Sequence, residues 1–295
     1  MKMKLRNGTL IEVQDGQERM LSFLYGSALG RILLKPLTRP WISKAAGRLL
    51  STKASCVLIG PFIKKNGIDM SQFEEKEYES YNEFFSRKIR EGARIIDSNP
   101  EHLISPCDCK LTVLPIRMDC RFNLKHTEYT VASLLKNKKL AKEYDGGYAM
   151  IFRLTVDDYH RYCYIADGTK AENVFIPGRL HTVNPIANDY FPIYKENSRE
   201  YTVLHTEEFG DVIMMEVGAL LVGKIVNHHG KGKISRGQEK GYFQFGGSTI
   251  VLLVRKNTVQ IDRDILKNSQ DGIETVVRMG EKIGRSIRTP YERIS

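Results

Sequence analysis

Residues 245–254 read FGGSTIVLLV, a glycine pair and a serine that lead directly into an apolar run. The run from Thr249 to Val254 has the aliphatic, β-branched composition of a buried strand. Gly247 has no Cβ, so the Ser248 hydroxyl can approach the preceding carbonyl, and glycine tolerates backbone conformations that strain other residues. The stretch therefore predicts a buried strand that begins at a serine able to attack its own chain.

Self-cleavage at this serine would have a chemical product of its own. Attack of Ser248 Oγ on the Gly247 carbonyl would give an ester. Elimination from that ester and loss of ammonia would leave a pyruvoyl group, a ketone that can act as an electron sink. Because Gly-Gly-Ser also occurs in ordinary turns, the alternative is a non-catalytic, membrane-associated β-barrel module in which residues 246–248 form a hairpin turn.

The bulk composition is that of a folded protein, with 295 residues, 41% hydrophobic and 27% charged. The five cysteines are an odd number without the spacing of a secreted framework, so they are expected to be reduced thiols. No residue set has the spacing of a metal site, and none is expected. The longest stretch without a charged residue, 241–254, has 14 residues, whereas a membrane-spanning helix needs about 20.

Most of the net charge of +10 lies in one segment. Residues 19–68 contain nine Lys and Arg and no Asp or Glu. Apolar residues recur there at helical spacing, as in Leu21, Leu24, Tyr25 and Ile32, which predicts basic amphipathic helices at the interface of an anionic membrane. The alternative is a pair of helices that packs on the body and exposes a basic face. No nucleic-acid motif accompanies the charge, so no nucleic-acid partner is expected.

The pattern along the chain predicts an α+β fold. Residues 17–90 have a helical pattern that includes an amphipathic stretch at 74–90, and short apolar strands begin near residue 103, among them 110–116, 148–154, 161–165, 173–176 and 249–254. Asp167-Gly168 predicts a hairpin turn between 161–165 and 173–176. We expect an N-terminal helical, basic, membrane-interface region (1–95) and a β-rich catalytic domain (96–295).

Seven short motifs resemble the phosphatidylserine decarboxylase family, a family of pyruvoyl-dependent membrane enzymes that make phosphatidylethanolamine. The motifs occur in the family's order and span the expected catalytic body: Phe84-Phe85-x-Arg87, Ser105-Pro106-x-Asp108, Asp158-Tyr159-His160-Arg161, Val183-Asn184-Pro185, Glu216-Val217-Gly218-Ala219, Gly241-Tyr242-Phe243 and Gly246-Gly247-Ser248-Thr249.

The resemblance implies cleavage between Gly247 and Ser248 into a β chain (1–247) and an α chain (248–295) that stay associated. It implies a pyruvoyl cofactor formed from Ser248, which would decarboxylate phosphatidylserine through a Schiff base with the serine amine. The enzyme would sit peripherally on the cytoplasmic side of the cell membrane, in contact with anionic phospholipid. The alternative within this chemistry is a pyruvoyl decarboxylase that acts on another amino-acid head group. A homo-oligomer is possible and is left open.

The resemblance also implies an Asp-His-Ser triad for self-cleavage, with Asp108 and Ser248 as two members. Its histidine is not settled, because Cys163 stands where the family often has the processing base. A thiol is a poor base beside a carboxylate. The candidates are His160 and His181; we expect His181 to be the processing base and His160 to return the proton during decarboxylation.

Overall fold

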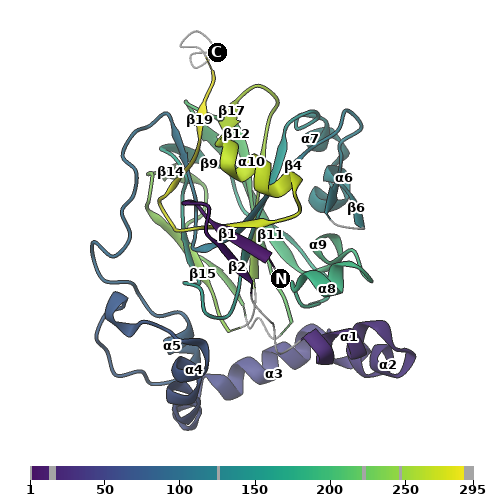
Figure 1. Ribbon diagram of the computed structural model, residues 1–295, viewed down its shortest axis with the longest axis vertical. Helices are drawn as coiled ribbons and strands as arrows, with labels where there is room; N and C mark the ends of the chain where they lie inside the picture. Colours follow the sequence, from purple (N-terminus) through teal and green to yellow (C-terminus); the bar gives the residue numbers. More distant parts are fainter. Residues whose placement is uncertain (1, 13–17, 125–126, 221–223, 246–247, 289–295) are drawn as a thin grey trace.

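The computed structural model of the chain describes residues 2–12, 18–124, 127–220, 224–245 and 248–288. Gly246 and Gly247, and with them the expected cleavage bond, lie outside the described residues. The described part is a mixed α+β fold with a large sheet at its centre, the N-terminal helices gathered at one end, and short helices beside the sheet (Figure 1).

The main sheet has eleven strands in the order β14-β9-β11-β12-β16-β7-β4-β18-β1-β2, with β10 paired to β11. Its strands are β1 (Lys2–Leu5), β2 (Leu10–Glu12), β4 (Cys109–Pro115), β7 (Tyr148–Leu154), β9 (Gly168–Lys170), β10 (Val174–Ile176), β11 (Arg199–Thr206), β12 (Gly210–Val217), β14 (Gly232–Ile234), β16 (Ser248–Val254) and β18 (Glu274–Val277).

Three smaller sheets accompany it. They are formed by β13 (Ile225–Asn227), β15 (Glu239–Phe243) and β8 (Arg161–Cys163); by β17 (Val259–Ile261), β19 (Lys282–Ser286) and β3 (His102–Ile104); and by β5 (Arg121–Leu124) and β6 (Thr127–Thr130). The helices of the body are α5 (Tyr81–Phe85), α6 (Val131–Leu135), α7 (Lys138–Lys142), α8 (Pro185–Asn188), α9 (Ile193–Glu196) and α10 (Arg263–Gln270).

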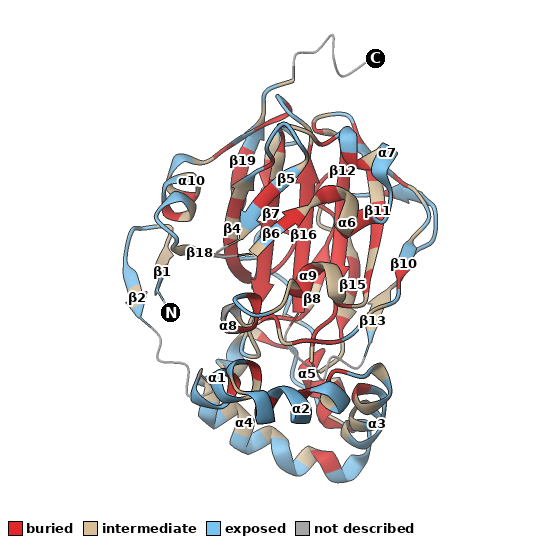
Figure 2. Ribbon diagram, turned by 90° about the vertical axis from the view of Figure 1, so that its right-hand side faces the viewer, coloured by how far each residue is buried: buried red, intermediate tan, exposed pale blue. Residues whose placement is uncertain are grey.

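Strand β16 runs through the middle of the main sheet and is buried along its whole length. It lies antiparallel between β12 and β7, with Ser248 opposite Leu154 and Thr249 opposite Val217. Successive side chains point to opposite faces, so Val251 and Leu253 join a core shared with α1 and α6–α9. The alternate residues of β16 join a core shared with the smaller sheets and α10. Burial on both faces explains why this strand reads as a continuous apolar run (Figure 2).

The N-terminal helices form a layer across one end of the body, below the sheet in Figure 1. They are α1 (Glu18–Gly26), α2 (Ala28–Leu37), α3 (Pro40–Leu50), the 3₁₀ helix η1 (Lys53–Leu58) and α4 (Ile59–Asn66). Leu21, Tyr25 and Leu34 are buried in the core shared with the sheet, so the layer is docked on the body. Among the described residues, no helix combines the length and the apolar character needed to cross a membrane.

Parts of the predicted local structure are wrong. The helix expected over 74–90 is limited to α5, where the Ser80 side chain accepts a hydrogen bond from the Glu83 amide and starts a new helix. Upstream of it, the 3₁₀ helix η2 (Met70–Gln72) ends at Phe73, which bridges to Ile89 in extended backbone. The predicted hairpin around Gly168 does not form either, because β8 pairs with β15 and β9 pairs with β11 and β14.

Candidate active site

Ser248 is the first residue of β16 and is completely buried. Its place opposite Leu154 puts it beside the end of β7, where the chain leaves the sheet for the loop that leads to β8. The start of this central strand is held by β7 at Ser248 and by both β7 and β12 from Thr249 onward. Its hydroxyl is therefore fixed in position before any reaction takes place.

His160 ends the loop between β7 and β8 and faces this serine. Its Nδ1 lies 3.2 Å from Ser248 Oγ, and its Nε2 lies 3.0 Å from the carbonyl oxygen of Thr155. The imidazole is 1% exposed, and the ring of Phe85 packs against it with centroids 4.1 Å apart. A histidine and a serine in this arrangement have the geometry of a base and nucleophile pair.

The contacts of His160 fix its tautomer. A carbonyl oxygen can only accept, so Nε2 carries the hydrogen that is donated to Thr155, and Nδ1 carries the lone pair that accepts from the Ser248 hydroxyl. Burial, with the positive charge of Arg87 as the next cause, lowers the pKa of His160 to about 3. The ring is therefore neutral near pH 7, in the form that can accept the serine proton.

His160 is oriented by its own loop, residues 155–160, between β7 and β8. The Asp158 carboxylate accepts from the backbone amide and the hydroxyl of Thr155, at 2.7 and 2.8 Å. Lys110 Nζ donates to the same carboxylate at 2.7 Å and to the Thr155 hydroxyl at 2.6 Å. These bonds hold the Thr155 carbonyl that fixes the imidazole. Asp158 was visible in the sequence only as part of a motif, and Thr155 and Lys110 carried no sequence signal for this role.

Asp108 lies elsewhere in the hydrogen-bond network. Its carboxylate is clasped by Arg94, with Nε at 2.9 Å from Oδ1, and it accepts from the backbone amide of Met279 at 2.8 Å. Within the described residues it makes no hydrogen bond to His160 or Ser248. The structure thus brings His160 to Ser248, whereas Asp108 binds Arg94, which precedes it in the chain, and Met279, which follows it.

His181 is buried between α1 and the body. Its Nδ1 lies 3.5 Å from Tyr25 Oη, its Nε2 lies 3.4 Å from a Glu196 carboxylate oxygen, and its ring stacks on Phe191 with centroids 4.9 Å apart. Burial lowers its pKa to about 4. Its contacts in the described structure join the N-terminal layer to the body, and none of them is with Ser248.

Cys163 does not take the place of the missing histidine. Its side chain is buried, and that burial raises its pKa to about 12, so it remains a neutral thiol. All five cysteines are free. In the described part of the chain, no group of three or more His, Cys, Asp or Glu side chains is placed to hold a metal ion.

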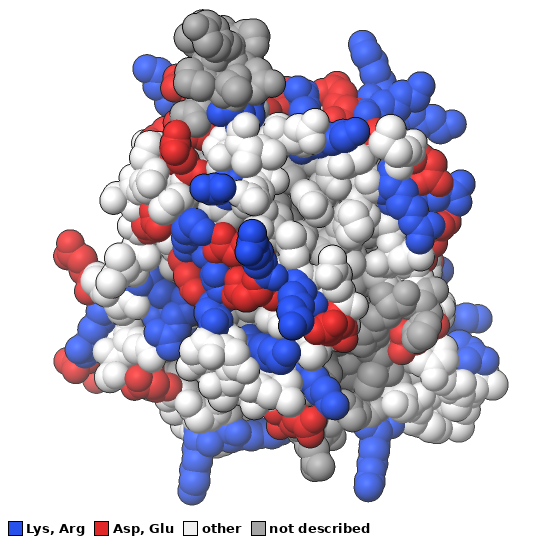
Figure 3. All heavy atoms as spheres, turned by 45° about the horizontal axis from the view of Figure 1, so that its top comes forward, with Lys and Arg blue, Asp and Glu red and all other residues white. Residues whose placement is uncertain are grey.

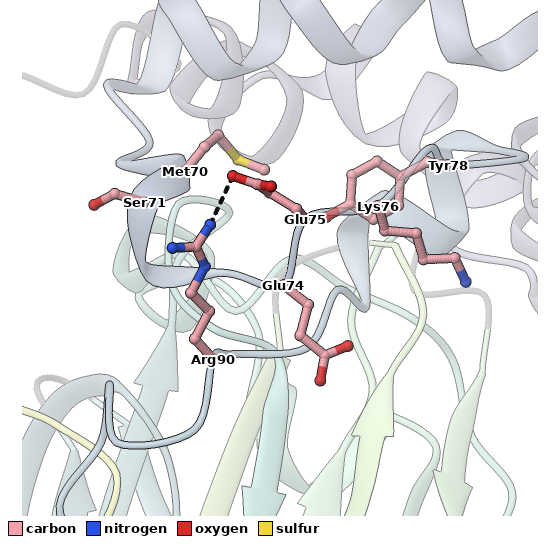
Figure 4. A pocket seen from close by; sticks show the side chains of 7 residues that line it. All are labelled: Met70, Ser71, Glu74, Glu75, Lys76, Tyr78 and Arg90. Atoms are coloured by element: carbon pink, nitrogen blue, oxygen red, sulfur yellow. Dashed lines mark hydrogen bonds and ion pairs between the residues drawn. The ribbon is translucent and has the colours of Figure 1, made fainter.

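A surface hollow of about 430 Å³ has neither Ser248 nor His160 in its lining (Figure 4). It is lined by Met70, Ser71, Glu74, Glu75, Lys76, Tyr78 and Arg90. Arg90 donates to Glu75 at 2.9 Å across it. Because the hollow contains neither member of the pair, we do not assign it to the active site.

Comparison with known proteins agrees with this geometry. The family model described as phosphatidylserine decarboxylase matches residues 81–285. A phosphatidylserine decarboxylase proenzyme 2 from Clostridium acetobutylicum is 52% identical over 93% of this chain and 94% of its own length. Proenzymes of the same name from Ruminiclostridium cellulolyticum and Fusobacterium nucleatum are 41% and 40% identical, over 91% and 90% of this chain and 92% and 91% of their own lengths.

The family match covers α5, the loop that carries His160, and the strand that begins at Ser248. The relatives extend the similarity over the N-terminal layer as well, since they cover at least nine-tenths of the chain. The chain belongs to the phosphatidylserine decarboxylase family.

Proposed function

We propose that this protein decarboxylates phosphatidylserine to phosphatidylethanolamine, using a pyruvoyl group that it forms from Ser248 by self-cleavage after Gly247. The observation that carries the proposal is the contact of 3.2 Å between Ser248 Oγ and the unprotonated Nδ1 of a neutral, fully buried histidine. The relatives named as proenzymes support a chain that is processed before it acts.

Self-cleavage starts with His160. As Ser248 Oγ attacks the Gly247 carbonyl, its proton passes to Nδ1, and the amide is converted into an ester whose released amine takes up a proton. Loss of the Cα proton of residue 248 then expels Gly247 as a carboxylate. Hydrolysis by water then releases the nitrogen of residue 248 as ammonia and leaves a ketone. The balanced products are a β chain of residues 1–247, ammonia, and an α chain with a blocked start. Both roles expected for histidines thereby fall on His160, with the Thr155 carbonyl and Asp158 as its orienting groups.

The surroundings of Ser248 fit a group that must remain in place after the bond is cut. The new chain start stays paired on both sides through β7 and β12. When formed, the pyruvoyl ketone supplies an electron sink for the departing carboxylate. His160 Nδ1 faces the same position and can hold a proton there for return to the substrate carbon. The neighbouring Phe85 ring helps to exclude water.

The N-terminal layer is proposed to hold the enzyme on an anionic membrane. Exposed apolar side chains on these helices include Phe23, Leu29, Ile32, Trp41 and Leu49, which are 47–69% exposed. They lie among the nine basic residues of 19–68. On the face of the body seen in Figure 3, acidic and basic side chains are instead interspersed. Apolar side chains surrounded by cations are what an interfacial helix presents to lipid.

Intact-mass analysis of the purified protein tests the cleavage. We expect a fragment of about 5.5 kDa, scaled from 48 of the 295 residues of the 33.7 kDa chain, with a carbonyl-reactive start. Ser248→Ala should remain one chain without carbonyl signal or carbon dioxide release, and Ser235→Ala, at an exposed serine, should cleave normally. A wild-type protein that stays at 33.7 kDa after ageing and releases no carbon dioxide from phosphatidylserine would overturn the proposal.

A further inference from the structure

Arg87 is a buried cation with half of its guanidinium unused. It is 2% exposed and lies over the rings of Phe73 and Phe84, at 4.1 and 4.8 Å from their centroids. Its Nη1 donates to the Phe84 carbonyl at 3.3 Å. Its Nε and Nη2 are buried and have no hydrogen-bond partner among the described residues. A buried charge in this state is costly unless an anion completes it.

Two other arginines of the chain show what this edge of the guanidinium does. Arg94 clasps Asp108 through Nε and Nη2, and Arg153 clasps Glu274 in the same way, with Nε at 2.9 and 2.8 Å from a carboxylate oxygen. The Nε–Nη2 edge presents two parallel N–H donors that match an oxyanion. In Arg87 the same edge is turned away from its only hydrogen-bond acceptor and has no carboxylate against it in the described structure.

This free edge lies close to the reacting pair. Phe85, two residues before Arg87, packs on the His160 ring at 4.1 Å, and the intervening Ser86 carbonyl accepts from Arg161 Nε at 2.8 Å. Arg87 is also near enough for its charge to contribute to the lowered pKa of His160. The segment that presents Arg87 is thus attached to His160 and to the residue that follows it.

We propose that the Nε–Nη2 edge of Arg87 binds the phosphodiester of the phospholipid head group and so positions the serine moiety at the reacting centre. This inference rests on the proposed function. The phosphodiester is favoured over the serine carboxylate because its charge does not change in the reaction. A cation on the carboxylate would stabilise the ground state that must lose its charge as carbon dioxide leaves.

Self-cleavage changes how α5, the helix that precedes Arg87, is covered. The Phe245 ring packs on Phe85 and Tyr81, each with centroids 5.1 Å apart, and its amide donates to Asn82 at 3.3 Å. Cutting the chain after Gly247 leaves Phe245 two residues from a free end. After the cut, the Phe245 ring is no longer tied through the chain to β16, so it can leave α5 without disturbing the strand pairings.

The test is the kinetics of Arg87→Met and Arg87→Lys with phosphatidylserine in detergent micelles. Arg87→Met removes the charge and the N–H donors, and Arg87→Lys keeps the charge but removes the planar edge. Self-cleavage into two chains shows that each variant folds. We expect KM to rise roughly 10- to 100-fold for methionine, the range for loss of a charge-assisted contact, and less for lysine, with kcat little changed. Lys88→Met, which removes an exposed charge one residue away, should keep the wild-type KM.

Two soluble inhibitors distinguish the head-group anions. Glycerophosphoethanolamine carries the phosphodiester without the carboxylate, and N-acetylserine carries the carboxylate without phosphate. We expect the Arg87 variants to lose inhibition by the first and to keep whatever inhibition the second shows. An unchanged KM, or a loss confined to N-acetylserine, would overturn the inference although the wild type cleaves and releases carbon dioxide. A wild type that does neither would instead overturn the proposed function. If Arg87→Met fails to cleave, the KM of Arg87→Lys and its inhibition by the two compounds test the inference by the same criteria.

Discussion

His160 reaches Ser248 because a short loop turns back at the end of β7. Leu154 lies opposite Ser248 in the sheet, and five residues after Thr155 the chain returns to the same place. Asp158 fixes this turn by accepting from both donors of Thr155. The spacing of Thr155, Asp158 and His160 is therefore what places the imidazole beside Ser248.

Substitution of the two histidines separates their roles. His160→Ala should leave the precursor uncut, since loss of a general base typically slows a proton transfer by about 10²-fold or more. His181→Ala should still cleave, because its side chain contacts α1 and α9 rather than Ser248. The measurement is the fraction of cleaved chain on a denaturing gel. Normal cleavage by His160→Ala, with precursor accumulating in His181→Ala, would contradict the assignment.

The pH dependence of self-cleavage follows from the pKa of about 3 for His160. Between pH 8 and pH 5 the imidazole stays neutral, so the rate of cleavage should not fall as the pH is lowered across this range. A histidine with its ordinary pKa near 6.5 would instead lose about tenfold in rate per pH unit below that value. Pulse-chase of precursor made by cell-free translation measures the rate. A decline that begins near pH 6.5 would contradict the prediction.

A buried ion pair stabilises the same end of the sheet. Lys240 Nζ donates to Glu216 at 2.8 Å and to Asn227 at 2.8 Å, and both charged residues are inaccessible to solvent. Glu216→Leu alone should lower the free energy of unfolding by about 3–5 kcal/mol, because it leaves a buried ammonium without its counter-ion.

The double variant Glu216→Leu/Lys240→Met serves as the control for this pair. It should recover much of the lost stability, since two apolar groups replace two charges. Denaturant unfolding of chains carrying Ser248→Ala, which avoids mixing cut and uncut protein, measures both. Equal loss in the single and double variants would show that packing, and not the unpaired charge, sets the cost.

At the scale of elements, the N-terminal helices divide their apolar residues between two faces. Leu21 and Tyr25, expected to face a membrane, are instead buried against the body. A second set, including Trp41 and Leu49, is exposed at 64% and 69%. One stripe thus packs on the body, as in the second interpretation of the segment, while another is exposed, and its contact with a membrane stays a prediction (Figure 2).

Charge substitutions on α3 test the proposed membrane contact. Trp41→Glu/Leu49→Glu should abolish pelleting with anionic liposomes while leaving self-cleavage intact, because neither side chain contributes to the core. The matched control is Ile95→Glu/Met118→Glu, at residues that are 84% and 73% exposed outside the helical layer. High salt should weaken binding of the wild type by screening the basic residues. Undiminished pelleting of the α3 variant would place the contact elsewhere.

At the scale of the whole molecule, strands of the proposed α chain pair with strands of the proposed β chain. Strand β16 lies between β12 and β7, and β18 lies between β4 and β1. Polar contacts add to this, since Arg6 binds Asp262 at 2.9 Å and Arg153 clasps Glu274. Cutting one bond before β16 leaves all of these pairings in place.

The two chains should therefore remain together after cleavage. Size-exclusion chromatography in native buffer should give one peak that contains both fragments, and separation should need denaturant. Wild-type protein and Ser248→Ala should elute at the same volume, because the fold does not change. Loss of the small fragment during native dialysis would show that the pairings of β16 do not hold the chains together.

The sequence by itself determined the α+β class and the strands at 148–154 and 249–254, and it led to the prediction that Ser248 is the reacting serine. Each of these depends on a local pattern: apolar runs set the buried strands, and the glycine pair marks the serine. The family motifs indicated that His160 and Asp158 belong to the site, but they did not predict which groups these residues contact. Nothing in the local pattern distinguished His160 from His181, since both are single histidines near apolar segments.

Only the tertiary structure decided which groups meet. β8 pairs with β15 rather than with the strand that follows Gly168, so the expected hairpin does not form. Asp108 is taken by Arg94 and Met279, residues 14 and 171 positions away in the chain. The free edge of Arg87 is visible only when all of its neighbours are placed. Long-range strand pairing and burial fix these contacts, and they depend on the whole core rather than on any short stretch of sequence.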